Sequence, residues 1–305
     1  MDNIHTEQSV LPSVRELLKG AIDYAGLFPP SNLSMSDAVI NYAAYRNSNF
    51  SWMLGRFVLP VSQLPEFMEC AQDFMARDSE NMWRLSALSG EDINKTVREI
   101  ESFNQEYAGP AVIDSLEVKA NTISKIDNTA SALPEGVTAY FEIDTGDNLA
   151  DLVAELSKKR QRAKIRTGGV TVEAFPSTAD IIRFVKTCLA ANVPFKATAG
   201  LHHPIRCYRP LTYESNAQQG TMHGFLNLFL MTGVLLEGFR PTLLEHIMEE
   251  EYDEVFAFDD TGVTWQGEFM LSTRSIERLR RLGIQSFGSC SFDEPVADLQ
   301  KLGIL

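Results

Sequence analysis

Residues 163–200, AKIRTGGVTVEAFPSTADIIRFVKTCLAANVPFKATAG, contain two short apolar runs separated by a segment with the pattern of an amphipathic helix. The runs at 163–169 and 194–200 have the length and composition of buried strands, and each ends in glycine. The segment at 177–192 has helical length and spacing. A strand, a helix and a strand in this order predict a parallel βαβ unit that is buried on both faces.

The same alternation extends in both directions along the chain. Most of the candidate strands are separated by helical segments of ten or more residues, and eight such units in one domain predict a single (β/α)8 TIM barrel. An open doubly wound sheet is the alternative. The eight candidate strands are RFVLPV (56–61), WRLSALSG (83–90), SLEVKA (115–120), VTAYFEID (137–144), AKIRTGG (163–169), PFKATAG (194–200), VFAFDD (255–260) and QSFGSC (285–290).

Two parts of the chain fit this scheme less well. Residues 1–50 are predicted to form a helical extension, with helices at 13–28 and 34–47, and the barrel is expected to occupy 51–305. Near the other end, FAFDDTGVTWQGEF has more of the character of a hairpin than of a strand and a loop. The strand expected at 255–260 therefore has the weakest support of the eight.

Composition and charge limit the partners. The chain has 305 residues and a formal net charge of −14, which argues against nucleic-acid and anionic-membrane partners because both require a basic face. The four cysteines form no CxxC pair and suggest no disulfide framework. The apolar stretch at 224–239 is interrupted by Asn227 and Thr232 and is expected to be a buried helix. We expect a cytoplasmic protein, and the sequence leaves open whether it forms a homo-oligomer.

In a (β/α)8 barrel the active site lies at the carboxyl ends of the strands. Several charged side chains interrupt apolar strands at or near these ends, where each needs a partner or a function. The polar and charged residues selected in this way are Arg56, Glu117, Lys119, Glu142, Asp144, Lys164, Arg166, Lys196, His202, His203, Asp259, Asp260 and Cys290.

Lys164 and Lys196 lie on successive predicted strands. A second cation and burial both lower the pKa of a lysine, and a neutral amine can attack a carbonyl group to form a Schiff base. The alternative is a static ion network, in which the two lysines pair with Glu117, Glu142 or Asp144. Arg166 can bind an anionic substrate group bidentately, or it can pair with a carboxylate of the barrel.

The histidines allow three interpretations. His202 and His203 follow a predicted strand, and His223 begins the long helix. One of them could act as a general acid or base beside the lysines, or they could cap the helix and bind loop backbone. In the third interpretation, His202 or His203 joins His223 and Asp259 or Asp260 in a metal site. No HxH or HxxxH spacing supports a metal site, and we infer neither a metal nor a cofactor.

Residues 110–305 resemble the class I aldolases of the deoxyribose-phosphate aldolase type. The resemblance rests on Lys164 with Thr167 and Gly168, and on Lys196 with Ala199 and Gly200. FEIDTGD and SFGSCSF resemble two further strand ends of that family.

The resemblance implies that Lys164 forms the Schiff base and that Lys196 lowers its pKa. It places Ser289 and Ser291 near a substrate phosphate. The chain departs from the pattern of that family at two places. Lys119 occupies the position of the proton-relaying aspartate, after Glu117. Leu201, His202 and His203 replace the phosphate-binding glycine.

Asp293 and Glu294 would repel a phosphate at the last helix, so a substrate other than a phosphosugar is expected. Our leading hypothesis is a lyase that acts on a small carbonyl compound through Lys164. Glu142, Asp144, His202 or His203 would then move the proton. The alternatives are a metal-dependent barrel enzyme that uses His and Asp ligands, and a barrel that binds a small molecule without catalysis. The residues expected to contact the substrate are Arg166, Thr167, Gly168, His202, His203, His223, Ser289 and Ser291.

Overall fold

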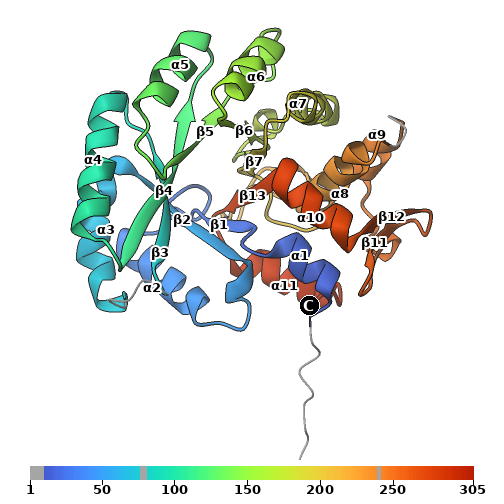
Figure 1. Cartoon of the computed structure of the whole chain (residues 1–305). Helices are drawn as coiled ribbons and strands as arrows, with labels where there is room; N and C mark the ends of the chain where they lie inside the picture. Colours follow the sequence, from blue (N-terminus) through green and yellow to red (C-terminus); the bar gives the residue numbers. More distant parts are fainter. Residues whose placement is uncertain (1–9, 76–80, 239–241) are drawn as a thin grey trace, which may run out of the picture.

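The protein is a (β/α)8 barrel. The computed structural model describes residues 10–75, 81–238 and 242–305, and Figure 1 shows the barrel strands surrounded by helices. Eight strands form a closed barrel in the order β1-β13-β7-β6-β5-β4-β3-β2. Each neighbouring pair is parallel. The barrel strands are β1 (Ile22–Tyr24), β2 (Leu54–Pro60), β3 (Trp83–Leu88), β4 (Ala111–Lys119), β5 (Thr138–Glu142), β6 (Arg162–Arg166), β7 (Phe195–Thr198) and β13 (Ile284–Ser289).

Helices connect and cover these strands. The strand–helix–strand unit predicted at 163–200 is present as β6, α7 and β7, which confirms the pattern from which the fold was inferred. The helices are α1 (Pro12–Leu18), α2 (Met35–Arg46), α3 (Leu64–Ala71), α4 (Ile93–Glu106), α5 (Ile123–Ala132), α6 (Leu149–Lys158), α7 (Thr178–Ala190), α8 (Phe225–Leu236), α9 (Thr242–Glu249), α10 (Thr273–Leu282) and α11 (Asp293–Lys301). Short 3-10 turns occupy Ser51–Met53, Val61–Gln63, Gln72–Phe74, Val172–Ala174 and Asp253–Val255.

The first barrel strand lies where a helix was predicted. Helix α1 ends at Leu18, so only the beginning of the expected helix at 13–28 is helical, and Gly20 then adopts a φ of +57° before β1 begins. All three residues of β1 are buried, so this short strand carries no alternation of apolar and polar residues by which it could be recognised. The barrel therefore begins before residue 51, and the region 1–50 is not simply a helical extension.

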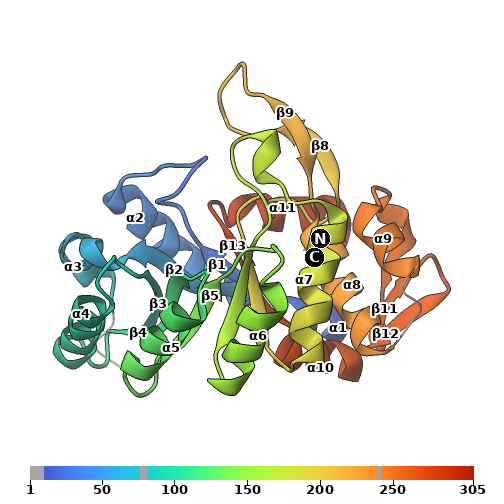
Figure 2. The same cartoon turned by 90° about the horizontal axis from the view of Figure 1, so that it is seen from above.

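The predicted strand at 255–260 is not part of the barrel. Its central residues form β10 (Phe256–Phe258), which pairs antiparallel with β11 (Gly262–Trp265), and β11 pairs with β12 (Phe269–Ser272). The hairpin character of this sequence is thus confirmed. A second antiparallel pair, β8 (Cys207–Pro210) and β9 (Gln219–Met222), stands out from the body of the molecule in Figure 2.

Helix α8 is apolar on all sides and is buried along nearly its whole length, as its sequence predicts. Its polar side chains are satisfied internally. Asn227 Nδ2 donates to the carbonyl oxygens of Ile247 and Glu250, and Thr232 donates to the carbonyl oxygen of Leu228. Within the described residues, no helix combines the length and the apolar character needed to span a lipid bilayer.

Candidate active site

The interior of the barrel contains a buried network of charged side chains. Lys196 Nζ on β7 donates to Asp23 Oδ2 on β1 at 2.6 Å and to Glu117 Oε1 on β4 at 2.7 Å. Neither β1 nor β4 is a neighbour of β7, so these bonds cross the inside of the barrel. Lys196 is only 1% exposed. Its buried ammonium group therefore links β7 to two strands, β1 and β4, that are not its neighbours in the barrel.

Lys164 occupies the adjacent position in this network. Its Cα is in register with that of Lys196 on the neighbouring strand. Lys164 Nζ lies 2.6 Å from Glu117 Oε2 and 2.9 Å from Glu142 Oε2. The two oxygens of Glu117 thus contact different lysines, and this carboxylate bridges Lys164 and Lys196. The static ion network that the sequence left open is present for Glu117 and Glu142.

Electrostatics in the network favour the charged forms. Burial would raise the pKa of Glu117, but the two lysine ammonium groups outweigh it and hold the pKa well below its usual range. Burial would lower the pKa of Lys196, but Asp23 and Glu117 outweigh it and raise the pKa. Lys196 was expected to lie near Lys164 as a second cation. Instead, the carboxylate of Glu117 lies between the two ammonium groups.

A cavity of about 310 Å³ opens at the carboxyl ends of the strands, where the sequence predicted the site. Lys164, Glu117 and Glu142 contribute to its lining. Arg166 follows Lys164 by two residues on β6 and therefore lies on the same face of the strand, nearer the mouth. Lys119 has the same relation to Glu117 on β4. The apolar part of the wall includes Ala25, Phe28, Pro29, Val58, Leu88 and Val118.

A thiol and an imidazole form another part of the cavity wall. His202 Nδ1 lies 3.8 Å from Cys290 Sγ and 3.3 Å from Glu294 Oε2. Tyr213, from the loop between β8 and β9, donates to Glu294 Oε2 at 2.9 Å. Burial opposes protonation of His202, but Cys290 and Glu294 outweigh it and raise its pKa to about 9. Burial would raise the pKa of Cys290, but its contacts, above all with His202, lower it.

Three residues that were predicted to handle protons or substrate are held away from the cavity lining. Asp144 is exposed, and its Oδ2 accepts a hydrogen bond from Asn121. His203 Nδ1 lies 2.6 Å from Asp298 Oδ2. His223 Nε2 lies 2.9 Å from the carbonyl oxygen of Pro176, and burial lowers its pKa. These contacts explain why Asp144, His203 and His223 do not meet Lys164.

Four further residues expected to contact the substrate have structural contacts. Thr167 Oγ1 donates to the carbonyl oxygen of Ala199 at 2.7 Å. A Cβ on Gly168 would lie 2.8 Å from the Cα of Gly200, so glycine is needed where the loops after β6 and β7 touch. Ser291 Oγ accepts from the backbone N–H of Glu294 in the first turn of α11, and Ser289 Oγ accepts from the N–H of Ser291.

The hypothesised metal ligands do not converge. No group of three or more His, Cys, Asp or Glu side chains in residues 10–75, 81–238 and 242–305 has an arrangement that could hold a metal ion. Asp259 Oδ1 instead accepts hydrogen bonds from the backbone N–H groups of Thr261 and Gly262 in the turn after β10. This turn belongs to the small antiparallel sheet rather than to the barrel.

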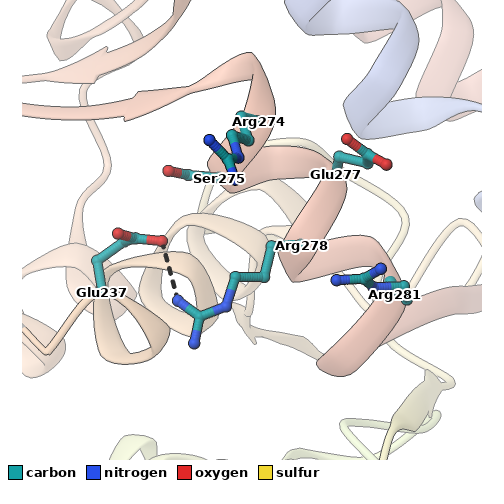
Figure 3. A pocket seen from close by; sticks show the side chains of 6 residues that line it. All are labelled: Glu237, Arg274, Ser275, Glu277, Arg278 and Arg281. Carbon is teal, nitrogen blue, oxygen red and sulfur yellow. Dashed lines mark hydrogen bonds and ion pairs between the residues drawn. The ribbon is translucent and has the colours of Figure 1, made fainter.

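A larger hollow of about 510 Å³ lies outside the barrel (Figure 3). It is lined by charged and polar side chains of α10 together with Glu237, which follows α8, and Arg278 pairs with Glu237 at 3.4 Å. No barrel strand contributes a lining residue. The cavity at the carboxyl ends of the strands is therefore the better candidate for an active site.

Sequence reasoning missed Asp23 and the contact between His202 and Cys290. Asp23 is a carboxylate inside a buried run, AIDYA, and would have been recognised had that run been assigned to a strand. His202 and Cys290 are 88 residues apart, and no local spacing connects them.

Comparison of the chain with protein-family models, with curated proteins and with solved structures finds no match.

Proposed function

We propose that this protein is a lyase that acts on small carbonyl compounds through a Schiff base on Lys164. The observation that carries the proposal is the position of Lys164, a buried amine that lines the cavity and contacts Glu117 and Glu142. Lys196 is buried between Asp23 and Glu117 and does not line the cavity. This arrangement supports Lys164 as the nucleophile and Lys196 as a residue that positions Glu117.

The amine of Lys164 must lose a proton before it can attack. Glu142 Oε2, 2.9 Å from Lys164 Nζ, is placed to accept that proton. The free amine adds to the carbonyl carbon, and loss of water gives a protonated imine. Cleavage of the bond between the next two carbons sends its electron pair into the imine and forms an enamine. A base removes the hydroxyl proton of the leaving fragment, which departs as an aldehyde or ketone.

Of the four residues proposed from the sequence to move the proton, Glu142 and His202 lie where they can exchange protons with this chemistry. The cavity lining contains both of them, whereas Asp144 and His203 are bound elsewhere. With its pKa raised to about 9, His202 is protonated at neutral pH and can donate a proton. The enamine gains a proton at carbon to regenerate an imine, and water then releases the second product and the free lysine.

Borohydride trapping tests the proposal. Hydride reduces a protonated imine to a stable secondary amine, so a carbonyl compound that reacts with Lys164 leaves a covalent mass increase on it. We expect the adduct to map to Lys164 and to disappear in Lys164→Arg, which keeps a cation between Glu117 and Glu142 but removes the amine. Lys95→Arg, at an exposed pair on α4, is the matched control and should retain the adduct. If folded protein gives no adduct with any small aldehyde or ketone, the Schiff-base proposal is wrong.

A further inference from the structure

Two cations at the mouth of the cavity have no acidic partner among the described residues. Lys119 and Arg166 both line the cavity. Among the residues that the structure describes, neither is joined to a carboxylate by an ion pair. Arg166 instead donates through Nε to the carbonyl oxygen of Gly168 at 3.1 Å, which holds the guanidinium near its own loop. Its terminal nitrogens have no hydrogen-bond acceptor in the part of the chain that the structure describes.

The acidic side chains nearby are already occupied. Lys119 is in register with Glu142, and Glu142 is in register with Lys164. Glu142 contacts Lys164, and Glu117 contacts both Lys164 and Lys196. The carboxylates on this side of the cavity, Glu117 and Glu142, are therefore already paired with Lys164 and Lys196. Lys119 and Arg166 remain as uncompensated positive charges in a chain with a net charge of −14.

On the opposite side of the cavity, the cation His202 already has an acidic partner, Glu294. The first turn of α11 contains Asp293 and Glu294, and Glu294 already contacts His202 and Tyr213. A helix N-terminus attracts anions, but the two carboxylates in this first turn repel a further anionic group. A substrate that reacts with Lys164 would thus place its negative group toward β4 and β6. An arginine fork matches a carboxylate with two parallel hydrogen bonds.

We propose that Lys119 and Arg166 bind the carboxylate of a short-chain oxo acid whose carbonyl group reacts with Lys164. This inference rests on the proposed function, since it names the substrate class for the same cavity. The cavity volume of about 310 Å³ is suited to a small molecule. The carboxylate would orient the molecule so that its carbonyl carbon faces the buried amine.

Borohydride trapping with matched compounds tests the substrate class. The oxo acid 4-oxobutanoate is compared with butanal, which has the same chain length and no charge. Glycolaldehyde phosphate and glycolaldehyde form a second pair. We expect half-maximal labelling of Lys164 at a concentration at least about tenfold lower for 4-oxobutanoate than for butanal, because hydrogen bonds to charged groups have about this effect.

Variants assign the preference to the two cations. In the double variant Lys119→Met with Arg166→Met, the half-maximal labelling concentrations of 4-oxobutanoate and butanal should become about equal, whatever the overall labelling rate. Lys125→Met, at an exposed position on α5, makes a single unit change in net charge away from the cavity and should retain the advantage. Retention of the advantage in the double variant would overturn the assignment of the carboxylate to these residues.

A second measurement separates this inference from the Schiff-base proposal. Succinate has the same chain length as 4-oxobutanoate, carries a carboxylate in place of the aldehyde group and forms no imine, so its binding can be measured by calorimetry. Succinate binding that the double variant abolishes supports the inference even if nothing is trapped. Equal trapping of 4-oxobutanoate and butanal would refute it and leave the Schiff base standing. A greater advantage for glycolaldehyde phosphate over glycolaldehyde would refute the choice of a carboxylate. Absence of both trapping and succinate binding would refute both proposals.

Discussion

Replacing Lys196 with methionine tests the buried network directly. Lys196 is 1% exposed and does not line the cavity, so its loss mainly affects the interior. Methionine has a similar length but no charge, and it would leave Asp23 and Glu117 without the cation that they share. Removing one partner of a buried ion pair costs about 3–5 kcal/mol of folding free energy. We expect a loss in this range at pH 7.

The loss should depend on pH in a defined direction. In the wild type the pKa of Glu117 lies well below its usual value, so the stabilisation is present above the ordinary carboxyl pKa and decreases as the pH falls. The difference in free energy of unfolding between wild type and Lys196→Met should therefore be largest near neutral pH and should decrease toward acid pH. The raised pKa of Lys196 means that the contribution is also lost as the pH rises above the ordinary value for lysine.

Urea unfolding, followed by circular dichroism at pH 7 and at pH 4 without added salt, measures the loss of stability at pH 7 and its decrease toward acid pH. The control is Lys95→Met, which removes an exposed pair with Glu99 at 3.8 Å and should change stability by about 1 kcal/mol or less. If Lys196→Met were as stable as the control at pH 7, or if its deficit grew toward acid pH, the described network would not stabilise the fold.

Three further measurements test other parts of the structure. The pH midpoint of iodoacetamide alkylation should be lower for Cys290 than for Cys70, because the pKa of Cys290 is lowered and that of Cys70 is raised, and the midpoint, unlike the rate, does not depend on how exposed each thiol is; a lower midpoint for Cys70 in peptide maps would contradict this. Gly168→Ala should lower the free energy of unfolding in urea by about 1–3 kcal/mol. Gly146→Ala should change it little, because the nearest atom to the added Cβ is 3.7 Å away; equal decreases would refute the close contact at Gly168. The pKa of His202 is raised from 6.5 to about 9, so its stabilisation is complete below pH 6.5 and is lost as the pH rises toward 9; an NMR titration with a midpoint near 6.5 would show that the contacts of His202 are absent.

Local sequence patterns predicted most of the barrel, because burial between two layers of helices requires apolar strands of the observed length. The expected strand at 163–169 overlaps β6, and the one at 194–200 overlaps β7. The exceptions have physical reasons. β1 is three residues long and contains the charged Asp23, so it has no apolar run of sufficient length. The segment at 255–260 has strand propensity, but that propensity does not determine which sheet a strand joins.

The candidate site was predicted in part. The position of charged residues at strand ends selected Lys164, Glu142, Lys119 and Arg166, all of which line one cavity. The same reasoning selected Asp144 and His203, which make other contacts. Both follow a strand closely, and proximity along the chain does not determine which way a loop side chain turns.

The sequence by itself determined the alternation of strands and helices, and with it the placement of two lysines on adjacent strands. Hydrophobic periodicity is a local property, so it can be recognised in the sequence without knowledge of the fold. Only closure of the barrel decided that Lys196 meets Asp23, 173 residues away, and that Glu117 separates the two lysines. Such contacts depend on which strands face each other across the interior, and that information is not present in the spacing of neighbouring residues.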